Sequence, residues 1–351
     1  MARFDYSWTL ADANFTKDKG KVFSCFSCGG GSTMGYKLAG FDVLGCNEID
    51  PKMMDAYRTN HNPKYSFLEP IQEFKLRKDL PKELYDLDIL DGSPPCSSFS
   101  MAGNREKDWG KDKKFREGQA KQTLDTLFFD FIDLAKELQP KVVIAENVKG
   151  ILLGNARKYV KKIYEDFDAA GYYCQHWLLD ASKMGVPQKR ERVFFICLRK
   201  DLAEPVMYQK DIFNRMPKLD LRFNEDVIPF GSIADYTDES IIDHTEVSKY
   251  WDLVNPGQAF SKKHPKGYFF GNSKADSAKA LPTICAEPNH GTWHHTIKRR
   301  LNDTELMLGG SYPLDYDFRN LKSKYLIGMS VPPVMTAQIA TEVYNQWIKK
   351  I

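Results

Sequence analysis

From residue 21 to about residue 198, short apolar runs alternate with segments of helical periodicity, and this alternation strongly constrains the fold. The clearest apolar runs are KVFSCF, FDVLGCNE, DLDILDG and KVVIAEN, and helix-like segments such as PKMMDAYRTN and NARKYVKKIYEDFDAAG stand between them. Strands that alternate with helices form a mostly parallel sheet covered by helices. Two further runs, YYCQHWLLD and ERVFFICLR, are expected to close the sheet as an antiparallel pair.

The regular pattern ends after Arg199, where Pro, Asn and Gly recur between short aromatic pieces. We therefore predict an α/β domain over residues 1–199 and a smaller, irregular domain over residues 200–310. The tail regains helical periodicity in VPPVMTAQIATEVYNQWIKKI, so residues 311–351 are expected to return to the first domain.

Composition argues against a membrane or secreted protein. No apolar run reaches the roughly 18 residues of a membrane span, and the first residues lack a signal-peptide profile. The seven cysteines contain no CxxC pair, which is typical of a reducing compartment where thiols stay free. We expect a cytoplasmic protein with no membrane partner and with a thiol available for chemistry.

Charge is unevenly distributed, although the net charge is only +3. Residues 201–252 carry five basic and twelve acidic side chains, whereas residues 253–300 carry eight basic and two acidic ones. The segment 105–116 adds six basic against three acidic residues. A polyanion is expected to contact the two basic stretches and to avoid the acidic one. Charge alone leaves open that both stretches are simply solvated faces.

A glycine-rich turn joins the first two predicted strands. Gly29, Gly30 and Gly31 allow a sharp turn and a close approach to a ligand, and Glu48 follows at a distance suited to a ribose. This arrangement indicates a nucleoside-bearing cofactor, either a nicotinamide dinucleotide or S-adenosylmethionine. A tight structural turn is the alternative, because a strict GxGxxG is absent.

Reactive side chains follow two later strands. Cys96 comes directly after a strand and the Pro94–Pro95 pair, in a polar setting that favours a nucleophile over an inert thiol. Glu146 and Asn147 end another strand and are expected at the same edge of the sheet, unless Glu146 only caps a helix. In QKRER, alternation along an extended segment allows Arg190 and Arg192 to face one side.

Taken in order, the segments FSCGGG, NEID, SPPCSSFS, ENV, QKRER, RRLNDTE and GMSVPP resemble the motif series of the DNA cytosine-5 methyltransferases. The similarity covers nearly the whole chain after about Lys21, with a variable stretch between QKRER and RRLNDTE. It implies a Rossmann-like, S-adenosylmethionine-dependent methyltransferase sheet with helices on both faces and a smaller target-recognition domain. The expected substrate is double-stranded DNA and the expected product of the cofactor is S-adenosylhomocysteine.

The resemblance also implies roles for individual residues. Cys96 would be the nucleophile, Glu146 and Arg192 would hold the target cytosine, and Arg190 and Asn147 would complete the catalytic set. A second group would bind the cofactor: Phe26, Ser27, Cys28, Gly29, Gly30, Gly31, Glu48, Ile49, Ile71, Pro95, Leu127, Met329, Ser330 and Val331. A third group would contact DNA: Ser98, Arg105, Lys262, Lys263, Lys266, Arg299 and Arg300.

Several positions depart from the family pattern. Cys28 replaces a glycine, Met329 replaces an asparagine, Pro70 or Glu69 stands where an aspartate is usual, and Leu124 or Gln122 stands where an arginine is often found. These changes keep a catalytically impaired, DNA-binding descendant as an alternative. A transfer-RNA methyltransferase and a nicotinamide oxidoreductase are further alternatives that the motifs favour less.

Three histidines and a cysteine, at positions 290, 294, 295 and 285, follow no metal-ligand spacing, so we expect no metal site and surface or DNA-facing histidines. We further expect a monomer in a prokaryotic cell, associated with the nucleoid, with a cognate restriction endonuclease as an optional partner.

Overall fold

The computed structural model describes residues 3–95, 126–209 and 215–351. Cys96, Ser98, Arg105 and the predicted basic loop at about 100–118 therefore lie outside the described residues. The chain divides into two compact units. The sheet unit contains Phe15–Leu179, Glu191–Arg222 and Ile339–Ile351, and the second unit contains Met1–Asn14, Asp180–Arg190 and Phe223–Gln338. These boundaries differ from the predicted breaks at 199 and 310. Residues 1–14, 180–190 and 311–338 fall in the second unit, and residues 200–222 fall in the sheet unit.

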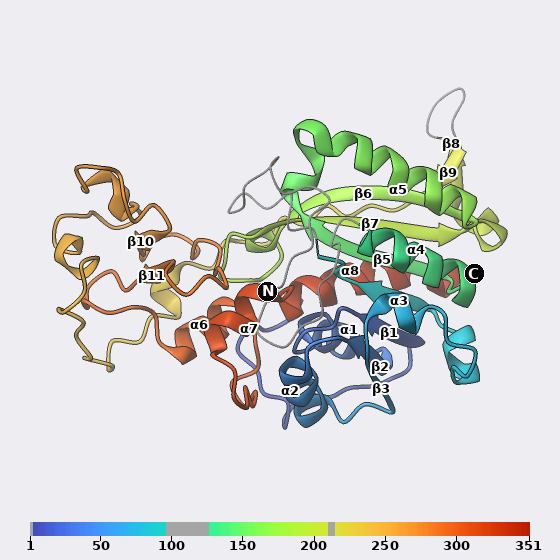
Figure 1. The fold of residues 1–351 in the computed structure, drawn as a ribbon, viewed down its shortest axis with the longest axis horizontal. Coiled ribbons are helices and arrows are strands. Elements are labelled where there is room, and N and C mark those ends of the chain that lie inside the picture. The colour runs from blue at the N-terminus through green and yellow to red at the C-terminus, as the bar shows by residue number, and fades with distance from the viewer. Residues whose placement is uncertain (1–2, 96–125, 210–214) are drawn as a thin grey trace. The chain divides into compact units, whose positions relative to one another are not determined.

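A seven-stranded sheet forms the sheet unit, in the order β3-β2-β1-β4-β5-β7-β6 (Figure 1). The strands pair in parallel from β3 through β5, and β7 runs antiparallel to β5. The predicted α/β class is thus confirmed, and the two runs expected to close the sheet, β6 and β7, are neighbours at its edge. The strands are β1 (Lys21–Cys25), β2 (Asp42–Glu48), β3 (Tyr65–Leu68), β4 (Ile89–Gly92), β5 (Val142–Val148), β6 (Tyr172–Asp180) and β7 (Glu191–Arg199).

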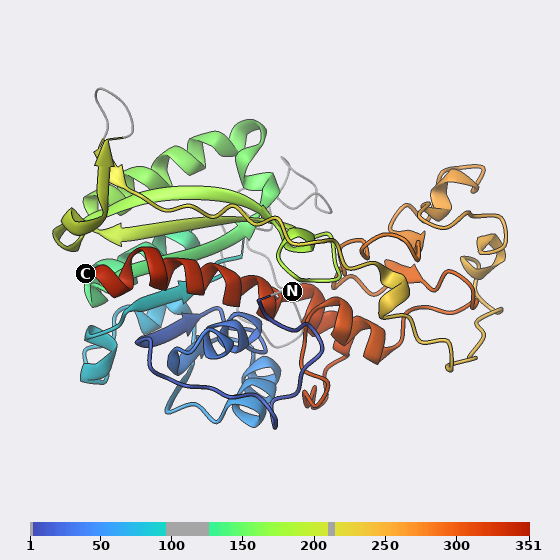
Figure 2. The same cartoon turned by 180° about the vertical axis from the view of Figure 1, so that it is seen from behind.

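Helices cover both faces of this sheet. One face packs against α3 (Ile71–Phe74), α4 (Leu127–Leu138) and α5 (Arg157–Ala169), in a core that includes Phe23 and Phe131. The other face contacts α1 (Gly31–Leu38) and α2 (Pro51–His61), and Figure 2 shows the last turns of α8 (Pro333–Gln346) there as well. Helix α2 begins where expected, because the Asp50 carboxylate accepts the N–H of Lys52 and a proline occupies the first helical position.

The second unit has little regular structure, as the sequence predicts. Its elements are β10 (Asn272–Lys274), β11 (Gly291–Trp293), α6 (Asp303–Gly309), α7 (Ser323–Met329) and the first half of α8; a short pair, β8 (Met207–Gln209) and β9 (Arg215–Pro217), belongs to the sheet unit. A capping box between Asn302 and Glu305 starts α6.

A buried ion pair organises this start of α6. The Arg299 guanidinium donates to both carboxylate oxygens of Glu305, at 2.6 and 3.1 Å, and both side chains are almost fully buried. His294 is also fully buried, so the expectation that it lies on the surface is wrong. Burial, the main cause, lowers the pKa of His294 to about 4, so its imidazole is neutral near pH 7.

A buried carboxylate ties the sheet to α1. The Asp91 side chain at the end of β4 accepts hydrogen bonds from Ser24 Oγ at 2.7 Å and from Tyr36 Oη at 3.0 Å. Burial raises the pKa of Asp91 to about 7, and the two hydrogen bonds only partly oppose that rise. The folded protein therefore binds a proton here that the unfolded chain releases at a much lower pH.

Replacement of Asp91 by Asn is expected to change how stability depends on pH. A raised folded-state pKa gives stability that is present below the unfolded pKa and is lost as pH rises through about 7. The wild type should therefore lose roughly 2–3 kcal/mol relative to Asp91→Asn between about pH 5 and pH 8, as measured by urea unfolding.

The matched control is Asp79→Asn, on an exposed carboxylate whose hydrogen bond with Arg77 lowers its pKa. That contribution is lost only below the unfolded pKa of Asp79, so this variant should follow the wild type over the same range. Parallel curves for Asp91→Asn and the wild type would contradict the assignment.

Candidate active site

The glycine-rich turn after β1 is built from backbone conformations that few side chains favour. Phe26, Cys28 and Gly30 have φ angles of 52°, 47° and 87°. At Gly30 a Cβ atom would lie 2.2 Å from His61 Nε2, so only glycine fits. His61 Nε2 lies 3.1 Å from the carbonyl oxygen of Gly29, and burial, the main cause, lowers the pKa of His61 to about 3. The neutral imidazole of His61, in α2, therefore packs against the turn.

Glu48, at the end of β2, holds the turn in place. Its Oε2 accepts the N–H of Cys28 at 2.8 Å, and its Oε1 accepts the N–H groups of Ile49 and Asp50 at 2.8 and 2.9 Å. Burial raises the pKa of Glu48, and the same three N–H groups oppose that rise. The carboxylate thus joins the glycine turn to the start of α2, which the sequence spacing alone did not reveal.

The other predicted cofactor residues divide between the two units. In the sheet unit, Ile49 and Pro95 are half-buried, whereas Ile71 and Leu127 lie in the apolar core. In the second unit, Met329 is exposed, and Ser330 Oγ accepts a hydrogen bond from Tyr312 Oη at 2.6 Å. Val331 is buried. Their roles toward a cofactor stay predictions.

The residues just before Cys96 are held by a hydrogen bond from Asn147. The buried Asn147 side chain donates from Nδ2 to the carbonyl oxygen of Pro94 at 3.2 Å, and its Oδ1 accepts the N–H of Val148 at 2.9 Å. Asn147 therefore ties the end of β5 to the turn that follows β4. Its geometry makes it a positioning residue for the segment that leads to Cys96.

An ion pair joins the neighbouring strands at this edge. Arg192 Nε lies 2.9 Å from Glu146 Oε1, and the two side chains are only 15% and 12% exposed. Because β7 is antiparallel to β5, its first residues lie beside the last residues of β5, with Arg192 opposite Val148. The pair places the carboxyl group of Glu146, on β5, beside the guanidinium of Arg192, on β7. Glu146 directly precedes Asn147 in β5. Such a pair can bind the hydrogen-bonding edge of a planar polar ring.

Arg190 has different hydrogen-bond partners from Arg192. It belongs to the second unit, where it is 2% exposed and donates to the carbonyl oxygens of Ile284 and Gly328 at 3.1 and 2.9 Å. Buried backbone carbonyls thus bind the Arg190 guanidinium, whereas Glu146 binds that of Arg192, and the expectation that both face one side stays a prediction.

The predicted DNA-contacting residues also differ in accessibility. Lys262, Lys263 and Lys266 are exposed, and Arg300 is half-buried. Arg299 is 1% exposed and bound to Glu305, so its prediction as a DNA contact is corrected to a structural role. No helix within the described ranges is long and apolar enough to cross a membrane.

Residues 20–345 match the C-5 cytosine-specific DNA methylase family, and the chain belongs to this family. Two bacterial relatives illustrate the similarity. The chain is 29% identical over 348 residues to the type II methyltransferase M.NgoPII of Neisseria gonorrhoeae, covering 92% of this chain and 95% of that protein. It is 37% identical over 182 residues to the type II methyltransferase M.FnuDI of Fusobacterium nucleatum, covering 52% of this chain and 48% of that protein.

Solved structures share the fold. A putative DNA modification methyltransferase encoded within an Escherichia coli prophage superposes with a TM-score of 0.63 at 22% identity, covering 93% of this chain and 98% of that one. A DNMT2 variant of Spodoptera frugiperda gives a TM-score of 0.62 at 18% identity, covering 91% and 98%. The predicted Rossmann-like methyltransferase fold is thereby confirmed.

Glu146→Gln is expected to reduce methyl transfer roughly 100-fold or more, because the amide cannot exchange a proton with a substrate ring. S-adenosylmethionine affinity should stay within about twofold, since Glu146 bonds to Arg192 and not to the glycine turn. Single-turnover rates and calorimetric titration measure the two effects separately.

Glu191→Gln is the control. It removes a carboxylate next to Arg192 in the chain, and this carboxylate pairs with Lys149 at the surface. It should leave both quantities near the wild-type values. An equal loss of cofactor affinity in Glu146→Gln would contradict the prediction that Glu146 acts on the target cytosine.

Proposed function

We propose that this protein transfers a methyl group from S-adenosylmethionine to carbon 5 of a flipped cytosine in a specific duplex DNA sequence, through a covalent Cys96 adduct. The observation that carries the proposal is the Glu146–Arg192 pair beside the Asn147–Pro94 link, at the carboxyl edge of the parallel strands. Similarity to type II methyltransferases supports a role in restriction and modification.

The donors and acceptors at the glycine turn fit the cofactor. Within the described ranges, Glu48 Oε2 accepts a single N–H, from Cys28, and a carboxylate oxygen has two lone pairs. One acceptor position therefore remains for a ribose hydroxyl. When bound, S-adenosylmethionine supplies an electrophilic methyl group.

The chain's own residues would then act on the cytosine. The Cys96 thiolate adds to carbon 6, which makes carbon 5 nucleophilic enough to take the methyl group. Glu146 supplies a proton or hydrogen bond at ring nitrogen 3, and Arg192 donates to the ring carbonyl oxygen. A base then removes the proton from carbon 5, and the thiolate leaves. The cytosine has to leave the duplex first, at a cost of a few kcal/mol.

The remaining residues of the set support this chemistry indirectly. Asn147 positions the turn before Cys96, and Arg190 is assigned a positioning role through the carbonyls of Ile284 and Gly328. The exposed lysines at 262, 263 and 266 suit contacts with DNA phosphates.

Cys96→Ser is expected to reduce methyl transfer to background while DNA binding stays intact, because a serine hydroxyl is far less ionised than a thiol near neutral pH. A duplex that carries 5-fluorocytosine should form a stable covalent complex with the wild type and not with Cys96→Ser. Fluorine cannot leave as a cation, so release of the cysteine would be blocked.

Cys174→Ser is the control, because Cys174 lies in β6, far along the chain from Cys96. This variant should still form the covalent complex. Denaturing gels detect the complex, and unmethylated transfer RNA is assayed in parallel. Transfer to RNA alone, or trapping by Cys96→Ser, would refute the proposed function.

Neutralising Lys262, Lys263 and Lys266 together with Gln should weaken binding to all duplexes and reduce the slope of log affinity against log salt by about 2.7. Asp226→Asn with Glu239→Gln is the control, because both carboxylates are exposed. Asp235 and Asp238 are unsuitable for it, since both accept hydrogen bonds from Asn302. If only the variant at Asp226 and Glu239 bound DNA more weakly, the assignment of the lysine-bearing surface as the DNA-contacting one would be wrong.

A further inference from the structure

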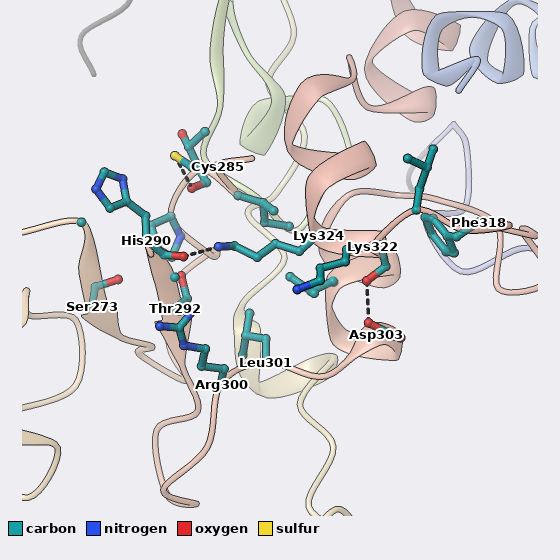
Figure 3. A pocket seen from close by; sticks show the side chains of 18 of the residues that line it. Ser273, Cys285, His290, Thr292, Arg300, Leu301, Asp303, Phe318, Lys322 and Lys324 are labelled. Carbon is teal, nitrogen blue, oxygen red and sulfur yellow. Dashed lines mark hydrogen bonds between the residues drawn. The ribbon is translucent and has the colours of Figure 1, made fainter. Parts of the chain in front are cut away.

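The second unit contains a cavity of about 790 Å³ that the proposed chemistry does not use (Figure 3). Its walls come from the ends of β10 and β11, the segment after Leu281, and the starts of α6 and α7. The volume lies within the usual range of small-molecule binding sites. The cavity is therefore large enough for a small organic molecule.

Among the charged side chains of the lining, positive ones outnumber negative ones. Arg300, Arg319, Lys322 and Lys324 contribute four cations, and Asp303 is the one carboxylate that lines the cavity among the described residues. Arg319 lies 3.6 Å from Asp317, but within the described part of the chain no carboxylate pairs with Arg300, Lys322 or Lys324. The cavity thus carries a local excess of positive charge, which favours an anionic ligand.

Two of these cations hold one wall of the cavity in place. Lys324 Nζ donates to the carbonyl oxygens of Glu287 and His290, and Figure 3 shows its side chain extended toward His290. Arg300 Nη1 donates to the carbonyl oxygen of Pro288 at 3.0 Å. Burial lowers the pKa of Lys324, and the nearby Arg300 charge adds to this effect. An anion in the cavity would relieve this repulsion.

Lys322 differs from its neighbours because its side chain is exposed and has no hydrogen-bond partner among the described residues. In Figure 3 its ammonium group extends into the space between Arg300 and Asp303. The Asp303 carboxylate accepts the hydroxyl of Ser323 instead. Lys322 is thus the cation that remains available to a ligand at little structural cost.

An exposed aromatic ring adds a second type of contact. Phe270 lines the cavity although it is 72% exposed, and its ring centroid lies 5.4 Å from that of His290. Exposed aromatic rings beside cations are typical of sites where a nucleobase stacks and its phosphate is neutralised. A simple inorganic anion would leave the Phe270 ring without a role.

We propose that this cavity binds one nucleotide unit, with its phosphate at Lys322 and Arg300 and its sugar or base against Phe270. We assign this nucleotide unit to the backbone of the DNA substrate, and this assignment rests on the proposed function. Residues 253–300, which carry eight basic and two acidic side chains, contribute many of the lining residues. A free nucleoside monophosphate has the same chemistry and is the other source.

The test compares Lys322→Gln, Lys322→Arg and Phe270→Ala with a control, Lys349→Gln, on an exposed lysine in the sheet unit. Duplex affinity is measured over a salt series, and thymidine 5′-monophosphate and inorganic phosphate are titrated by calorimetry. Lys322→Gln should weaken duplex binding about five- to tenfold and lower the salt slope by about 0.9, with Lys322→Arg restoring both. Phe270→Ala should weaken binding with an unchanged slope.

The outcomes separate the two sources. Loss of duplex affinity in Lys322→Gln supports the site on DNA, and loss of thymidine monophosphate binding with unchanged duplex affinity supports a free-nucleotide site. Affinities of Lys322→Gln that equal those of the wild type for all three probes would overturn the inference. Methyl transfer by the wild type tests the proposed function independently, and thermal melting verifies that each variant is folded.

Discussion

Parallel pairing of β1, β2, β4 and β5 is the constraint on which the candidate site depends. Parallel strands end at the same edge, so the segments that follow them converge although they are far apart in the sequence. The glycine turn, the Glu48 carboxylate, the Pro94–Pro95 turn and the Glu146–Asn147 pair all follow from that single arrangement. Hydrogen bonds then set the final positions, with Glu48 fixing the turn and Asn147 fixing the start of the Cys96 loop.

Much of the sheet unit could be predicted from the sequence, because its signals are local. Apolar runs of four to nine residues became strands. Gly30 marks a turn by its backbone freedom, and Asp50 marks a helix start by its side-chain carboxylate. The order of the motifs identified the family, which the match over residues 20–345 confirms. Strand ends also indicated which polar side chains would lie at the edge of the sheet.

Other features depended on contacts between distant residues, which no local pattern reveals. Arg190 and Arg192 have equal charge and stand two residues apart, yet the carbonyls of Ile284 and Gly328 bind one and Glu146 binds the other. Arg299 and Arg300 differ in the same way, because only Arg299 meets Glu305. Asp91 is one of three aspartates in the run DLDILDG, so neither its burial nor its partners Ser24 and Tyr36 could be predicted from that run.

The bonds that Arg190 makes have a consequence for evolution. Its acceptors at Ile284 and Gly328 are main-chain carbonyl oxygens, which every amino acid supplies. Side chains around Ile284 can therefore change without loss of this attachment, provided that the backbone path is kept. Only Gly328 is restricted, since a Cβ atom there would lie 2.4 Å from the backbone nitrogen of Ala286. Substitutions in the segment around Ile284 therefore leave this attachment intact, so the segment can diverge in sequence while the anchoring arginine stays unchanged.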